Sequence, residues 1–150
     1  MLINRQKQYA VSRGDLEQFI RRLRRRLPPG RRQFNVCLVD DRSIRRWNRT
    51  YLGRDRPTDV LSFPWGGGVG RREFAHFLGD IAISVETARR RAAAEGRSAL
   101  NELCRLILHG ALHLLGYDHE RDRGEMAFLE HAWRAQMGIE GRRRAGKRGE

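Results

Sequence analysis

The hydrophobic pattern of this chain predicts five helices. Between residues 12 and 27, apolar side chains recur every three or four positions, which is the spacing of one helix face; they are Leu16, Phe19, Ile20, Leu23 and Leu27. Further helices are predicted over residues 40–52, 84–95, 98–115 and 123–137. In the second helix, Trp47 and Tyr51 fall on the inner stripe, so we expect both side chains to pack in the core.

The ends of these helices carry suitable residues. Serines that can accept a hydrogen bond from a free backbone N–H precede three of them, at Ser12, Ser84 and Ser98. Glycines that can adopt a left-handed conformation follow three of them, at Gly53, Gly96 and Gly116. The helix boundaries are therefore predicted by the cap residues as well as by the apolar spacing.

Four segments rich in apolar and β-branched residues are predicted as strands, over residues 2–10, 34–39, 60–63 and 78–84. Pro64 either ends the third strand or marks it as an edge strand, since proline cannot donate to a neighbouring strand. Strands and helices are mixed at irregular spacing, so the fold class is α+β, with about four strands in a mixed sheet and about five helices.

The length of 150 residues indicates one domain, which we place at residues 1–137. Residues 138–150 are charged and lack an apolar pattern, so we expect a disordered basic tail. The glycine-rich stretch over residues 65–77 is either a loop that gates a substrate or a simple surface loop. His76 lies within it and has no partner at the spacing of a metal ligand.

The chain carries 31 Lys and Arg against 18 Asp and Glu, which gives a net charge of +13. Such an excess attracts polyanions, and arginine can bind phosphate through two parallel hydrogen bonds. A GC-rich genome would explain the choice of arginine over lysine but not the excess, so we favour a nucleic-acid partner. Five arginines share one helix face, which is either solvated or follows an RNA backbone; they are Arg21, Arg22, Arg24, Arg25 and Arg26.

The sequence also predicts the compartment. Its start has no long apolar run of the kind found in signal peptides, and no segment approaches the roughly 20 apolar residues of a membrane span. Cys37 and Cys104 both lie in apolar segments that are predicted as core. Two buried cysteines favour a reducing cytoplasm over a secreted, disulfide-bonded protein.

One stretch contains three of the five histidines of the chain: His109-Gly-Ala-Leu-His113-Leu-Leu-Gly-Tyr-Asp-His119. His109 and His113 are four positions apart, so they share one helix face, roughly opposite the centre of the apolar stripe. Gly116 can end the helix and let the chain bring His119 back to the same point. Three imidazoles at one point predict a site for one zinc ion, with a fourth position open. Imidazoles also bind nickel, copper and iron, so the sequence leaves the metal open.

The carboxylates near these histidines differ from those of zinc peptidases. In the His-Glu-x-x-His peptidases a glutamate follows the first histidine and acts as general base, whereas this chain has Gly110. Glu102 is expected on the same polar helix face as the histidines, but it lies two turns earlier, which is too far for it to act as the base. Asp118 is better placed to support a histidine ligand, and the alternative is that it only caps the last helix.

The histidine motif resembles the signature of the YbeY family of bacterial endoribonucleases and ribosomal-RNA maturation factors. Two further stretches carry the resemblance, Arg54-Asp-Arg-Pro-Thr-Asp-Val-Leu-Ser-Phe-Pro64 and Leu78-Gly-Asp-Ile81. Together they cover the chain from about residue 40 to 131. The resemblance implies the same α+β arrangement, with a distant likeness to zinc peptidases.

This resemblance implies that the chain would be a zinc-dependent, single-strand-specific endoribonuclease of the cytoplasm, with His109, His113 and His119 as metal ligands. It would act in 16S rRNA 3′-end maturation and in ribosome quality control. Its partners would be ribosomal RNA in the small ribosomal subunit, with ribosomal proteins or a ribosome-assembly GTPase as further candidates. Two other functions stay open: an RNA-binding assembly protein with a structural metal, and a metallohydrolase of peptides, against which both Gly110 and the charge of +13 count.

One position departs from the family pattern. Family members have an arginine after the aromatic residue that corresponds to Tyr51 and use it at the active site, whereas this chain has Leu52. Leucine cannot bind phosphate, so either Arg49, Arg54 or Arg56 replaces that arginine or catalysis is weaker. We rank Arg54 first, because Gly53 can let the chain turn it inward.

Overall fold

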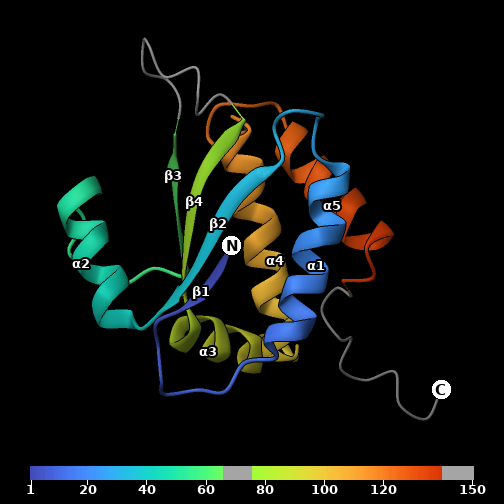
Figure 1. Cartoon of the computed structure of the whole chain (residues 1–150). Coiled ribbons are helices and arrows are strands. Elements are labelled where there is room, and N and C mark those ends of the chain that lie inside the picture. The colour runs from blue at the N-terminus through green and yellow to red at the C-terminus, as the bar shows by residue number, and fades with distance from the viewer. Residues whose placement is uncertain (66–75, 140–150) are drawn as a thin grey trace.

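A four-stranded sheet lies between α2 (Asp41–Leu52) on one side and α1 (Arg13–Arg26), α4 (Ala99–Leu114) and α5 (Glu125–Gln136) on the other (Figure 1). The computed structural model describes residues 1–65 and 76–139. The elements in chain order are β1 (Leu2–Asn4), α1 (Arg13–Arg26), β2 (Gln33–Val39), α2 (Asp41–Leu52), β3 (Val60–Pro64), β4 (Phe77–Ser84), α3 (Val85–Glu95), α4 (Ala99–Leu114) and α5 (Glu125–Gln136). The predicted α+β class is confirmed within these ranges.

The strand order is β1-β2-β4-β3, with β1, β2 and β4 parallel and β3 antiparallel to β4. Pro64 lies at the end of β3, and β3 is an edge strand. The first strand is shorter than the predicted range of 2–10. Side-chain hydrogen bonds of Gln6 to the backbone N–H and C=O of Tyr9 form a turn there instead.

The two faces of the sheet pack differently, because side chains alternate along each strand. One face carries Phe34, Val36, Leu38, Ile81 and Ile83 into the main core beneath α1 and α4. The other face carries Val39, Leu61 and Ala82 into a smaller cluster with Ile44 of α2. Among the described residues, α2 is thus the helix that packs on this second face.

The helix that carries two histidines, α4, is buried on nearly all sides. It packs against β3, β4, α1, α3 and α5. We expected Glu102 on a polar face beside the histidines, but this carboxylate is 2% exposed and pairs with Arg97 at 2.9 Å. The ion pair neutralises the carboxylate, which lets that side of the helix enter the core.

Several cap predictions are confirmed. Ser84 and Ser98 accept hydrogen bonds from Thr87 N–H and Asn101 N–H, and Gly53 and Gly96 end α2 and α3 at φ +69°. Ser12 precedes α1 as expected, but its hydroxyl donates to Asp15 instead of accepting from the helix backbone.

The expected burial of Tyr51 is wrong, whereas Trp47 is half-buried. Tyr51 is 66% exposed, because the C-terminal end of α2 extends beyond the smaller apolar cluster. Its ring meets Phe63 edge-on, with ring centroids 5.4 Å apart. The side chain is therefore available at the surface.

The described residues include no helix long and apolar enough to cross a membrane. The glycine-rich stretch falls mostly outside the described residues, as does the tail from residue 140. His76 is exposed, with Nδ1 3.0 Å from the Gly30 carbonyl oxygen. Ile139 is buried, so packing continues past residue 137, and the domain boundary at that position stays a prediction.

Candidate metal centre

His109 and His113 lie one turn apart on α4, with ring centroids 4.6 Å apart. Gly110 between them faces β4, and a Cβ there would lie 2.7 Å from Ile81 Cγ2. The Gly110 carbonyl accepts a hydrogen bond from the Ser62 hydroxyl at 3.3 Å. The missing side chain thus lets α4 approach the sheet, which sets both histidines beside β3.

The turn after α4 returns His119 to this pair, as the sequence predicts. Gly116 adopts φ +104°, and its N–H donates to the His113 carbonyl at 2.9 Å. The His119 ring then stacks near the His109 ring, with centroids 5.6 Å apart and planes at 16°. Among the described residues, Asp118 hydrogen-bonds to no histidine: its Oδ1 accepts from the Glu120 N–H, and its Oδ2 pairs with Arg121.

The carboxylate that does meet the histidines is Glu130 of α5, which the sequence reasoning missed. Glu130 Oε1 lies 2.8 Å from His109 Nδ1 and 2.8 Å from His119 Nε2. Arg134 Nη1 donates to Glu130 Oε2 at 3.3 Å. Burial raises the pKa of Glu130, but the hydrogen bonds from the two histidines outweigh this and lower it to about 2. The carboxylate is therefore ionised at neutral pH.

Potential metal-binding atoms of His109, His119 and Glu130 all lie within 4.8 Å of one another. His113 is not part of that group, although its ring contacts that of His109. Burial, followed by the charge on His109, lowers the pKa of His113, which favours the neutral imidazole that binds metals. Known catalytic zinc sites include three histidines, or two histidines and a glutamate, so the three histidines and Glu130 are donors that suit zinc.

A groove of about 830 Å³ leads to the histidines. His109 and His113 line it together with β3, Thr87 and Arg91 of α3 and the segment from Asn48 to Asp59. Buried Asn48 holds this segment by donating from Nδ2 to the Arg56 carbonyl at 2.9 Å.

Arg54, Arg56 and Leu52 all line the groove, so the structure brings Arg54 to the same groove as the histidines. Arg91 is paired with Asp59. The guanidinium groups of Arg54 and Arg56, by contrast, form no ion pair with any described residue. These two arginines can therefore bind an anion without breaking an existing pair.

The sequence of this chain is similar to those of known proteins. A family model described as Endoribonuclease YbeY matches residues 1–138. An Endoribonuclease YbeY of Solibacter usitatus is 45% identical over 129 residues, which are 86% of this chain and 82% of that protein. One of Geobacter sulfurreducens is 41% identical over 120 residues, which are 80% of each chain.

A solved structure is also similar. The solution structure of TM1509 from Thermotoga maritima is 27% identical in sequence and has a TM-score of 0.56, and the match covers 99% of this chain and 100% of that one. The family model spans His109, His113, His119 and Glu130, so every residue of the cluster lies within the matched region.

Proposed function

The chain belongs to the YbeY endoribonuclease family, and from this membership we propose that it is a metal-dependent endoribonuclease that cuts single-stranded RNA. Its role would be in maturation of the 3′ end of 16S rRNA and in ribosome quality control. The proposal rests on the geometry of the site: three histidines and a carboxylate lie together at one groove. Two arginines that form no ion pair with described residues line the same groove.

We propose that His109, His113 and His119 hold one zinc ion per chain. When bound, such an ion supplies a Lewis acid and a water molecule of lowered pKa near the scissile phosphate. Glu130 contacts two of the rings and would fix their orientation, as carboxylates commonly do for histidine ligands. Because Gly110 carries no side chain, the general base of His-Glu-x-x-His peptidases has no counterpart at this position.

Arg54 is proposed to bind the phosphate, with Arg56 beside it. Both line the groove, and the net charge of +13 favours an RNA substrate over a peptide. We expect an Arg54→Ala protein to lose RNA cleavage and RNA affinity. Arg31→Ala is the matched control, because Arg31 is exposed and lines none of the described cavities. An Arg54→Ala protein with full cleavage and affinity would refute this role.

The partners would be ribosomal RNA in the small ribosomal subunit and, among proteins, ribosomal proteins or a ribosome-assembly GTPase. The proposed compartment is the cytoplasm. In support, Cys37 and Cys104 are both free, which suits a reducing environment.

The direct test combines elemental analysis with cleavage of single-stranded RNA, on the wild type and on His113→Ala. His131→Ala is the control, because His131 is an exposed histidine on α5 that is not part of the cluster. We expect one zinc per chain and cleavage in the wild type and the control, with both lost in a folded His113→Ala protein. Zinc without cleavage, together with an unfolded His113→Ala protein, would instead indicate an RNA-binding protein with a structural metal.

A further inference from the structure

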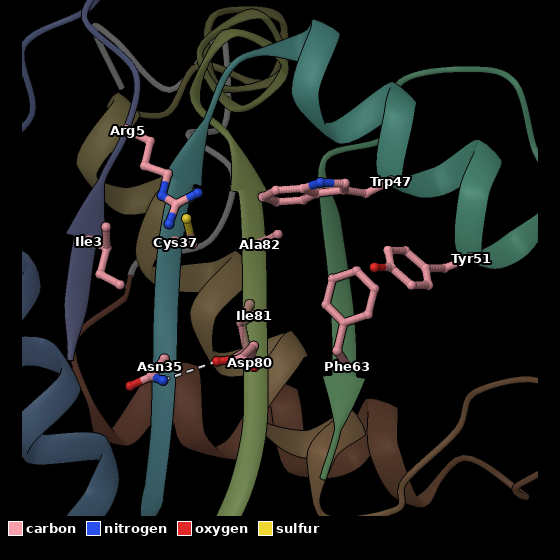
Figure 2. Close-up of a pocket in the computed structure, with 10 residues that line it drawn as sticks. All are labelled: Ile3, Arg5, Asn35, Cys37, Trp47, Tyr51, Phe63, Asp80, Ile81 and Ala82. Carbon is pink, nitrogen blue, oxygen red and sulfur yellow. Dashed lines mark hydrogen bonds between the residues drawn. The ribbon is translucent and has the colours of Figure 1, made fainter.

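A second cavity lies on the open face of the sheet, beside α2 (Figure 2). Its volume is about 480 Å³, within the range of roughly 300–1,000 Å³ that is usual for small-molecule sites. Asn35 and Cys37 of β2 and Asp80, Ile81 and Ala82 of β4 form its floor. The cavity exists because α2 covers only part of this face.

The walls of this cavity differ in chemistry. Trp47, Tyr51 and Phe63 stand on one side, and their rings meet edge-on at centroid distances of 6.5 and 5.4 Å. On the opposite side, Ile3 and Arg5 extend over β1 and β2 (Figure 2). The cavity is thus apolar on one side and cationic on the other.

The polar groups of the cavity leave a hydrogen-bond donor and an acceptor available. Asn35 Nδ2 donates to Asp80 Oδ1 at 3.0 Å, and Trp65 Nε1 donates to Asp80 Oδ2 at 2.8 Å. The Asn35 amide is thereby oriented, with its Oδ1 accepting no hydrogen bond from the described residues. The Arg5 guanidinium likewise has no hydrogen-bond partner in the described part of the chain.

The cavity adjoins the groove at the histidines. Tyr51 and Phe63 line both, and Tyr51 is 66% exposed between them. A chain that leaves the groove past Tyr51 therefore reaches the second cavity. A free phosphate would meet the carboxylate of Asp80 on the floor, so an uncharged, flat group with a hydrogen-bonding edge fits better.

We propose that this cavity binds one base of the single-stranded RNA, next to the nucleotides held in the groove. Aromatic side chains stack with bases, and Asn35 Oδ1 and Arg5 would contact the edge of the base. This inference rests on the proposed RNA cleavage and deepens it, because it assigns a recognition site outside the cluster of histidines.

The test measures binding of nuclease-resistant 2′-O-methyl phosphorothioate RNA oligomers, in which each member of a series lacks one base. The proteins are the wild type, Arg5→Gln and Asn35→Leu. The control is Arg25→Gln, which removes one charge from an exposed residue of α1, on the other side of the sheet. Fluorescence anisotropy gives the affinity for each oligomer, and circular dichroism checks that each variant is folded.

We expect loss of a base at one register to weaken wild-type binding about tenfold, in line with the stacking free energy of a base on an aromatic side chain. Arg5→Gln and Asn35→Leu should bind the complete oligomer more weakly and show little further loss at that register. Arg25→Gln should keep the tenfold difference.

A series in which wild type and Arg5→Gln lose the same factor at every register would overturn the proposal, even if Asn35→Leu fails to fold. Equal affinity of the wild type for all oligomers would overturn it too. If the wild type cleaves RNA in either case, only this inference fails. If it neither binds nor cleaves RNA, the proposed function itself fails.

Discussion

Gly110 provides the sharpest test of how α4 is held against the sheet. In an ordinary helix, Gly→Ala is stabilising by about 1 kcal/mol, because alanine loses less backbone entropy on folding. At this position an added Cβ would lie 2.7 Å from Ile81 Cγ2 and 3.1 Å from both Cγ1 and Cδ1. Helix propensity and packing therefore predict opposite signs for Gly110→Ala.

At this position the free-energy cost of the close contact should exceed the gain in helix propensity. Cγ2 is attached directly to the Cβ of Ile81, and β-branched side chains have few χ1 rotamers to choose from. Ile81 is also fully buried, so its side chain has no free space. Overpacking a core costs about 1–3 kcal/mol, and subtracting the gain in propensity leaves a net destabilisation of about 1 kcal/mol.

A double-mutant cycle isolates this contact. Ile81→Ala removes all three atoms that the new Cβ would meet, so in that background Gly110→Ala should stabilise the protein by about 1 kcal/mol. The two single changes should therefore couple by about 2 kcal/mol, measured by urea unfolding of the four proteins. If Gly110→Ala were more stable than the wild type, the close approach of α4 and β4 would be refuted.

Three other outcomes can be measured. Glu130→Gln should bind zinc about 10–100-fold more weakly in chelator competition, the usual effect of losing a carboxylate that supports histidine ligands, and unchanged affinity would contradict that role. Burial raises the pKa of Asp41, but hydrogen bonds from Ser84, Thr87 and Arg90 outweigh it and lower the pKa. The wild type should therefore be more stable than Asp41→Asn at neutral pH, with the difference disappearing as the pH falls below about 4, whereas a pH-independent difference would exclude the charge as its cause. Three arginines on α2 have no ion-pair partner among the described residues: Arg42, Arg46 and Arg49. Replacing all three by glutamine should reduce the slope of log K against log salt concentration for single-stranded RNA by about 2. An unchanged slope would show that RNA does not bind this face.

The histidine cluster could be predicted because its geometry is local. His109, His113 and His119 lie within eleven positions, and helix periodicity followed by a glycine turn is enough to bring them together. Glu130 could not be predicted in this way. It reaches the cluster from α5, and only the packing of α5 against α4 selects it over Asp118, which is adjacent to His119.

The errors in burial have similar causes. The spacing of Tyr51 is that of a core residue, but spacing does not show how far the apolar cluster beneath α2 extends. The C-terminal end of α2, with Tyr51, lies beyond that cluster. Glu102 has the charge of a surface residue, yet Arg97 neutralises it inside the core. In both cases the burial of the side chain depends on residues outside its own helix.

In the part of the chain that the structure describes, β1 and β3 lie at the two edges of the sheet, and these edges affect how the protein behaves at high concentration. Unpaired edge strands are templates for strand addition and hence for aggregation. Here β1 has three residues, and β3 has five and ends at Pro64, which has no N–H to donate. Both edges are too short to hold a second copy firmly, and the net charge of +13 makes copies of the chain repel one another. Concentrated samples should therefore resist edge-to-edge aggregation, and added polyanions, which cancel the repulsion, should be what brings copies together.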